Sequence, residues 1–103
     1  MLIFSPDAPT IAAVIAAVAD QPLHAPRSYT RLDGSETPRW TIPAGGVEIE
    51  VQDGEAASPA LITLTAEDPD AAVARALAAG AGQLRQLRAF VQVGPLRIQV
   101  VPS

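Results

Sequence analysis

Two short polar stretches hold the residues that could do chemistry in this chain of 103 residues. Glu48 and Glu50 alternate with apolar residues, and so do Arg97 and Gln99 near the C-terminus. Alternate residues of a strand point to the same face, so each pair is expected on one polar face of a sheet. Two neighbouring carboxylates could form an acid–base pair. An arginine on the adjacent strand would instead give a plain ion pair, and we favour that interpretation, with Arg39 or Arg97 as the partner.

The aromatic residues and the single histidine are further candidates. Trp40 is the only tryptophan and lies in an alternating segment. On the open side of a sheet it would stack on a flat ligand, and on the other side it would belong to the core; the sequence leaves both placements open. Tyr29 and Phe90 are expected to serve packing, with a place in the lining of a pocket as the alternative for either. His24 is the only histidine and lies between two prolines, so we expect it in a loop rather than as a base or metal ligand.

Composition excludes several classes of function. The chain has no cysteine, which excludes disulfides, thiolate catalysis and cysteine metal sites, and no lysine, which excludes a lysine Schiff base. A net charge of −4 argues against a nucleic-acid partner. The apolar run at residues 11–19 is too short to cross a bilayer and follows no positive segment, so we expect no membrane contact and a cytoplasmic location. Abundant alanine without lysine is typical of a bacterial protein from a GC-rich genome.

The first half of the chain predicts a strand, a helix and three further strands. Residues 2–4 form a short apolar strand, and Thr10 is the expected N-cap of a helix whose larger apolar residues share one face. Further strands are expected at residues 24–32, 39–42 and 47–52, separated by glycine-containing turns. The helix also has an alanine face, which we expect to pack against a second helix or a second subunit.

The second half repeats this order after a polar linker. The predicted strand, helix and three strands lie at residues 60–65, 70–79, 83–87, 89–93 and 96–101. Asp68 and Asp70 are expected at the helix start, where negative charge is favourable, and not in catalysis. The sequence therefore predicts an α+β fold of two tandem βαβββ modules, residues 1–54 and 58–103. The modules form a single domain of residues 1–103, in which helices cover one side of a cupped mixed sheet and leave the other side free for a concave site.

Three motifs carry a family resemblance. Residues 61–81 combine a strand, an Asp-Pro-Asp-Ala-Ala helix start and an Ala-Ala-Gly-Ala exit, and residues 46–51 and 94–102 are two strands that begin at glycine. They resemble the vicinal oxygen chelate superfamily, which includes glyoxalase I, bleomycin-resistance proteins and extradiol dioxygenases. The resemblance covers nearly the whole chain and implies the same pair of βαβββ modules curled into an open cup.

The resemblance also implies where a divalent metal would be held, because family enzymes use His, Gln or Glu at four strand positions. Two of these positions correspond to Glu50 and Gln99, one to Leu61, which cannot bind a metal, and one falls at or before Met1. A catalytic divalent ion needs at least three protein ligands, so we expect no metal cofactor. A dimer that adds a second Glu50, or His24 turned inward, would be needed to complete a metal site.

The sequence leaves three functions open, and the favoured one makes the chain a binding protein rather than an enzyme. It is a metal-free, glyoxalase- or bleomycin-resistance-like protein whose concave pocket binds a small molecule and is lined by Trp40, Glu48, Glu50, Arg97 and Gln99. Arg97 would hold an anionic group and Trp40 would stack on the ligand. The second is a metal-dependent lyase or oxygenase with a site completed across a dimer. The third is a non-catalytic subunit that binds another protein. The resemblance implies a homodimer.

Overall fold

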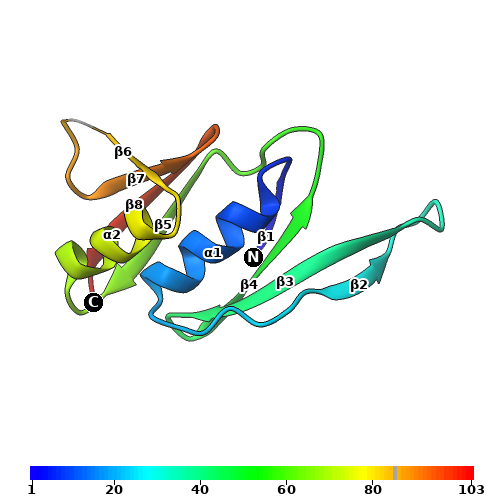
Figure 1. The fold of residues 1–103 in the computed structure, drawn as a ribbon, viewed down its shortest axis with the longest axis horizontal. Coiled ribbons are helices and arrows are strands. Elements are labelled where there is room, and N and C mark those ends of the chain that lie inside the picture. The colour runs from blue at the N-terminus through cyan, green and yellow to red at the C-terminus, as the bar shows by residue number, and fades with distance from the viewer. Residues whose placement is uncertain (85) are drawn as a thin grey trace.

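Two consecutive units of one strand, one helix and three strands make up the chain. Figure 1 shows them in the computed structural model, which describes residues 1–84 and 86–103. The first unit contains β1 (Leu2–Ser5), α1 (Ala8–Val18), β2 (Arg27–Thr30), β3 (Glu36–Ala44) and β4 (Val47–Asp53). The second contains β5 (Leu61–Ala66), α2 (Pro69–Ala78), β6 (Gly82–Gln83), β7 (Phe90–Val93) and β8 (Leu96–Pro102). The predicted α+β fold with two βαβββ modules is confirmed.

Each module forms its own four-stranded mixed sheet. The strand orders are β1-β4-β3-β2 and β5-β8-β7-β6. In both sheets the first strand of the module pairs in parallel with the last, and the other neighbours are antiparallel. The two helices lie side by side in front of the sheets (Figure 1). Each sheet therefore keeps one face turned away from its helix, and we call these two surfaces the open faces.

The hydrophobic core lies between the sheets and the helices. Ile11, Val14 and Ile15 of α1 are fully buried, and Ala12 and Ala16 are buried as well. The helix is apolar on more than one side because it packs on β3 and β4 and also on α2. The sequence predicted that α1 packs against a second helix or a second subunit, and the structure shows a second helix, α2. None of the helices in the described ranges has the length and apolar character needed to cross a bilayer.

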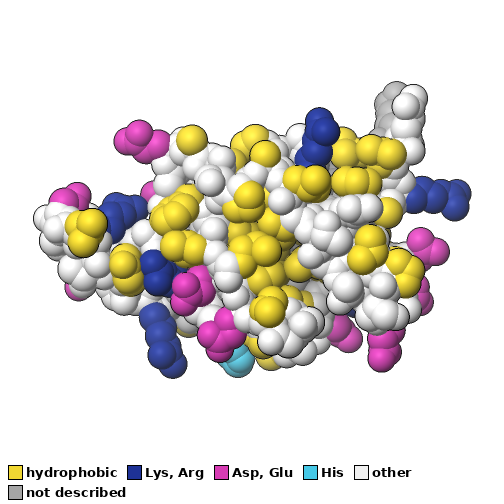
Figure 2. All heavy atoms as spheres, turned by 180° about the vertical axis from the view of Figure 1, so that it is seen from behind, with side chains coloured by type: hydrophobic (Ala, Val, Ile, Leu, Met, Phe, Trp, Pro, Cys, Tyr) yellow, Lys and Arg dark blue, Asp and Glu magenta, His cyan; other side chains and the backbone are white. Residues whose placement is uncertain are grey.

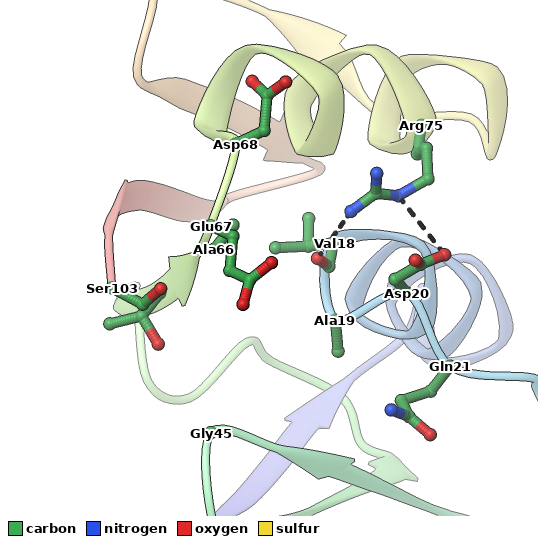
Figure 3. A pocket seen from close by; sticks show the side chains of 11 residues that line it. Val18, Ala19, Asp20, Gln21, Gly45, Ala66, Glu67, Asp68, Arg75 and Ser103 are labelled. Atoms are coloured by element: carbon green, nitrogen blue, oxygen red, sulfur yellow. Dashed lines mark hydrogen bonds and ion pairs between the residues drawn. The ribbon is translucent and has the colours of Figure 1, made fainter.

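Arg75 of α2 joins the two modules at the C-terminal end of α1. Its Nε donates to the carbonyl oxygen of Ala17 at 2.7 Å, and its Nη2 donates to that of Val18 at 3.2 Å. The same Nε lies 3.8 Å from Oδ1 of Asp20. Figure 3 draws this ion pair as a dashed line. The last carbonyls of a helix have no partner within the helix and attract positive charge. Arg75 therefore links α2 to the end of α1.

The turn between β3 and β4 fixes the register of the first sheet. Gly45 and Gly46 have φ angles of 59° and 84°, a left-handed conformation that glycine adopts without strain. A two-residue turn of this kind joins strands in a tight hairpin, and it places Ala44 opposite Val47. Counting back along both strands brings Arg39 opposite Gln52.

Some element boundaries differ from the prediction. Helix α1 begins at Ala8, with Asp7 rather than Thr10 at the N-cap, because a proline such as Pro9 is compatible with the first turn of a helix. The strand expected at residues 83–87 is only Gly82–Gln83, and residue 85 lies outside the described residues. The remaining strands and α2 agree with their predicted positions to within a few residues.

Candidate ligand-binding site

A row of side chains crosses the open face of the first sheet. Phe4 of β1 is the register partner of Gln52 of β4, and Gln52 is the partner of Arg39 of β3. Register partners lie on the same face of a sheet. Tyr29 of β2 is opposite Thr37, two residues from Arg39, so its ring lies on this face as well. All four strands therefore contribute to one continuous surface.

Arg39 is the centre of the polar contacts on this surface. Its Nε and Nη2 donate to Oε1 of Gln52 at 2.9 and 2.7 Å. Its Cζ lies 3.6 Å from the centroid of the Tyr29 ring, and its Nη1 lies 3.6 Å from Oε2 of Glu50. Only 19% of the Arg39 side chain is exposed. Charge-assisted hydrogen bonds and the stacked ring together hold the guanidinium plane in one orientation.

A hollow of about 720 Å³ opens beside this network, within the size range of small-molecule sites. Its lining comes from β1, from β2, from β4 and from the loops that follow β2 and β4, namely Phe4, Tyr29, Arg31, Leu32, Asp33, Gln52, Asp53, Gly54 and Glu55. Gln52 is only 4% exposed. Because its oxygen accepts from Arg39, its amide nitrogen is the atom that can donate to a molecule in the hollow.

The charges around the hollow are mostly negative. One arginine and three carboxylates line it. Arg31 is partly neutralised by Asp53, with 3.8 Å between Nη2 and Oδ2. Oδ1 of Asp33 accepts hydrogen bonds from the hydroxyl and the backbone N–H of Ser35, at 2.6 and 2.9 Å. The hydrogen bond from the Ser35 hydroxyl lowers the pKa of Asp33 most, and the hydrogen bond from the Ser35 backbone lowers it further. The Asp33 carboxylate is therefore charged at neutral pH.

Arg97 and Gln99 lie on the open face of the second sheet and not beside Glu50. Arg97 is exposed and pairs with Leu61, while Gln99 pairs with Thr63, whose hydroxyl donates to Oε1 of Gln99 at 3.4 Å. The pocket that the sequence predicted combines residues of both sheets. Within one chain, the structure therefore does not bring its predicted lining together in a single sheet.

Glu48 and Glu50 lie on the open face of the first sheet, as their alternation predicted. Glu48 is exposed and pairs with Pro43. Glu50 is half-buried and forms the expected ion pair with Arg39. The two carboxylates thus fit the ion-pair interpretation rather than an acid–base pair.

Trp40 does not belong to the open face, and its predicted place in the pocket is wrong. It pairs with Val51, which is fully buried, and it packs against the hydrophobic core. The hairpin register turns Trp40, Ile42 and Ala44 toward the helix side, and Arg39 to the open face. The apolar series gains more from burial than from exposure, which is why the strand takes this orientation.

The remaining sequence candidates are where we expected them. His24 is exposed in the loop between α1 and β2. Asp68 is the N-cap of α2, and its Oδ1 accepts from the backbone N–H of Ala71 at 3.1 Å. Asp70 lies in the first turn of the same helix. Both aspartates therefore stabilise the positive end of α2.

Sequence reasoning missed two residues that build the site and favoured packing for a third. Phe4 and Gln52 were not identified as candidates, and Tyr29 was expected to serve packing, with the pocket lining as the alternative. Gln52 had a usable signal, because it continues the alternation of Glu48 and Glu50. Phe4 had none, since its exposure to the hollow depends on how the loop after β4 returns past β1.

The donors at the family's metal positions do not converge on one point. In the part of the chain that the structure describes, no three His, Cys, Asp or Glu side chains converge as metal ligands. Glu50 faces the guanidinium of Arg39, Gln99 takes a hydrogen bond from Thr63, and Leu61 has no donor atom. These residues do not fit a catalytic divalent ion, which needs three or more protein ligands.

A second cavity, of about 480 Å³, lies between the modules beside the Arg75 joint (Figure 3). Asp20, Glu67 and Asp68 are among its lining residues. The guanidinium of Arg75 already contacts the α1 carbonyls and Asp20. We interpret this cavity as part of the contact between the modules.

Three solved structures share this architecture over nearly the whole chain. The fosfomycin resistance protein FosX from Mesorhizobium loti has a TM-score of 0.65 at 14% identity and covers 97% of this chain and 86% of its own. FosX from Listeria monocytogenes has a TM-score of 0.66 at 11% identity, with 100% and 87% covered. The YycE protein of unknown function from Bacillus subtilis, a putative glyoxalase/fosfomycin resistance protein, has a TM-score of 0.63 at 11% identity, with 100% and 87% covered.

These similarities define the class of fold. The chain has the fold of the vicinal oxygen chelate superfamily, to which the FosX proteins belong, so the resemblance drawn from the sequence is confirmed for the fold. No family model matches the chain, and no curated protein matches its sequence. A variant of the L. monocytogenes FosX was solved with Mn(II) and 1S,2S-dihydroxypropylphosphonic acid. At such low identity the likeness concerns the fold and not the activity.

Proposed function

We propose that this protein is a glyoxalase-like small-molecule-binding protein that binds its ligand without a metal and without turnover, with residues 1–103 as one binding domain. The observation that carries the proposal is the fixed polar network of Arg39, Tyr29, Gln52 and Glu50 beside a hollow of about 720 Å³. A network that is ordered before the ligand arrives reduces the entropy lost on binding.

The same network argues for binding rather than metal-assisted catalysis. Glu50 is the strongest of the family-equivalent ligands, and its carboxylate is paired with Arg39. To bind Glu50, a metal would have to displace the Arg39 guanidinium. It would also need further ligands from outside the network of Arg39, Tyr29, Gln52 and Glu50. Arg39 and Gln52 are suited instead to hold a fixed hydrogen-bonding surface.

The proposal includes a homodimer. β1 and β5 are edge strands. On the outer side of β1, Ser58 exchanges two 2.9 Å backbone hydrogen bonds with Phe4, and among the described residues no strand pairs there. Large apolar side chains are exposed near these edges, with Leu2, Val47 and Leu61 at 36, 57 and 52%. Hydrophobic side chains gather in the middle of the face opposite the helices (Figure 2). Free edges with exposed apolar residues favour association with another chain.

A second copy of the chain would also add residues of the second sheet to the site. Arg97 and Gln99 lie on a different sheet from Glu50. In the proposed dimer they, together with Glu48, extend the site from the edges of the hollow.

The dimer is tested by its mass in solution. Light scattering coupled to size exclusion should give twice the chain mass for the wild type, and Leu61→Glu should lower it toward one chain. A monomeric wild type would contradict the dimer.

The proposed function is tested by thermal melting of the untagged protein with divalent metals and with a fragment library. We expect fragments, but not Ni, Zn, Mn, Fe or Co, to raise the melting temperature. Tyr29→Ala should remove the fragment shifts, whereas Leu23→Ala, which truncates a similarly exposed residue in a loop, should retain them. A stoichiometric metal whose effect disappears in Glu50→Ala would instead establish the metal-dependent alternative.

A further inference from the structure

We infer that the hollow on the first sheet takes a flat aromatic molecule that is neutral or positively charged and carries a hydrogen-bond acceptor. This inference rests on the proposed function and names the chemistry of its ligand. Three independent features of the hollow support it: the amide of Gln52, the two aromatic rings, and the excess of carboxylates.

The amide of Gln52 favours a ligand that carries an acceptor. Within the described residues, Nε and Nη2 of Arg39 are the donors to this side chain, and both bond to its Oε1, which fixes the orientation of the amide. The Gln52 residue is 96% buried, since its exposed fraction is 4%. No buried side-chain nitrogen or oxygen among the described residues lacks a partner, so the amide nitrogen of Gln52 must reach the solvent of the hollow that it lines. It offers a donor in a fixed place and no free acceptor.

The rings of Phe4 and Tyr29 give the hollow its apolar surface. The backbone of Gly54 packs closely against Phe4: a Cβ at position 54 would lie only 2.9 Å from the Phe4 Cβ. Tyr29 is held by the guanidinium of Arg39, 3.6 Å from its ring centroid. Because both rings are fixed from behind or from one side, little conformational freedom is lost when a flat molecule stacks on them.

The charges exclude an anionic ligand. Arg31 is already opposed by Asp53, and Asp33 and Glu55 add two further carboxylates to the lining. Like charges at a binding site reject a partner even where its shape fits. The phosphonic acid bound to the L. monocytogenes FosX variant is therefore the wrong chemistry for this hollow.

Three acridines of one shape test the inference. Acridone is neutral and carries a carbonyl acceptor. 9-Aminoacridine is a cation at neutral pH with no free acceptor, so it tests the charge preference alone. Acridine-9-carboxylate is an anion. Dissociation constants are measured by fluorescence with the full-length protein. Acridone and 9-aminoacridine should bind at least about tenfold more tightly than the carboxylate.

Gln52→Glu isolates the donor. The carboxylate keeps an oxygen for Arg39 but cannot donate, so acridone should bind about fivefold more weakly. The added negative charge should leave 9-aminoacridine binding unchanged or tighter, which a misfolded variant could not do. Gln83→Glu makes the same change on exposed β6 of the second sheet and should alter neither constant. Tyr29→Leu should weaken both ligands.

The outcomes separate the ligand class from the proposed function. If the carboxylate binds best and its binding requires Tyr29, the site exists but the ligand class is wrong. An equal loss of acridone and 9-aminoacridine affinity in Gln52→Glu would overturn the role of the amide donor. If no acridine binds while the fragment library yields a Tyr29-dependent ligand, the ligand class alone fails. If neither binds, both proposals fail.

Discussion

Replacing Arg39 by methionine should destabilise the protein strongly, because one side chain supports three neighbours at once. Methionine retains the apolar stem but loses both hydrogen bonds to Gln52, the stacking on Tyr29 and the ion pair with Glu50. The variant also leaves the oxygen of Gln52 buried without a partner, and burying an unsatisfied polar group is more costly than losing a hydrogen bond alone.

The contacts set the expected size of the effect. The two hydrogen bonds and the stranded oxygen of Gln52 account for about 2 kcal/mol. Stacking on Tyr29 adds about 1 kcal/mol, and the ion pair with Glu50, whose side chain is 37% exposed, adds a few tenths at most. A loss of about 3 kcal/mol in a domain of this size lowers the melting temperature by about 15 °C.

Urea unfolding followed by circular dichroism measures this effect, and a double-mutant cycle attributes it. Arg39→Met combined with Gln52→Leu removes donor and acceptor together, so we expect the pair to cost at least about 1.5 kcal/mol less than the sum of the single variants. Arg97→Met, on the exposed face of the second sheet, should stay within about 0.5 kcal/mol of the wild type. Additive single variants, or an Arg39→Met variant as stable as Arg97→Met, would refute the network.

Three further changes test other parts of the structure. Arg75→Met should cost about 2 kcal/mol by chemical denaturation, because two α1 carbonyls lose their donor, while Asp20→Asn should cost almost nothing; equal costs would contradict the joint. Gly54→Ala should displace Phe4 and weaken fragment binding in a melting assay, and unchanged binding would show that the close approach is unimportant. The lowered pKa of Asp33 adds stability above its ordinary value of 3.8 that is lost as the pH falls through the folded pKa; an NMR titration at or above 3.8 would refute this.

Much of the fold could be predicted because its repeated pattern is local. The alternation of β4 and β8 and the apolar spacing of α1 each fit one element type. The predicted start of α1 was too late in the sequence. Thr10 is a residue type that favours the N-cap position, but Pro9 is also compatible with the first turn of a helix. The helix starts at Ala8, which is fully buried. Local propensity was overruled there by burial.

The site was only partly predictable, because it depends on register and on loops. The two-glycine turn at Gly45 and Gly46 is visible in the sequence, and counting from it would have placed Gln52 opposite Arg39 and Trp40 on the core side. The hollow itself could not be found this way. It needs the loops after β2 and β4 to meet beside Phe4, and neither loop has a periodic pattern.

The most direct test of the account follows the side-chain amide of Gln52 by NMR while acridone is added to the ¹⁵N-labelled protein. We predict saturable shifts of this amide and of the backbone of Phe4, Tyr29 and Asp53, with little change at Gln83 of the second sheet. Shifts confined to the second sheet or to the cavity beside Arg75, with the Gln52 amide unmoved at saturation, would contradict the assignment of the binding site.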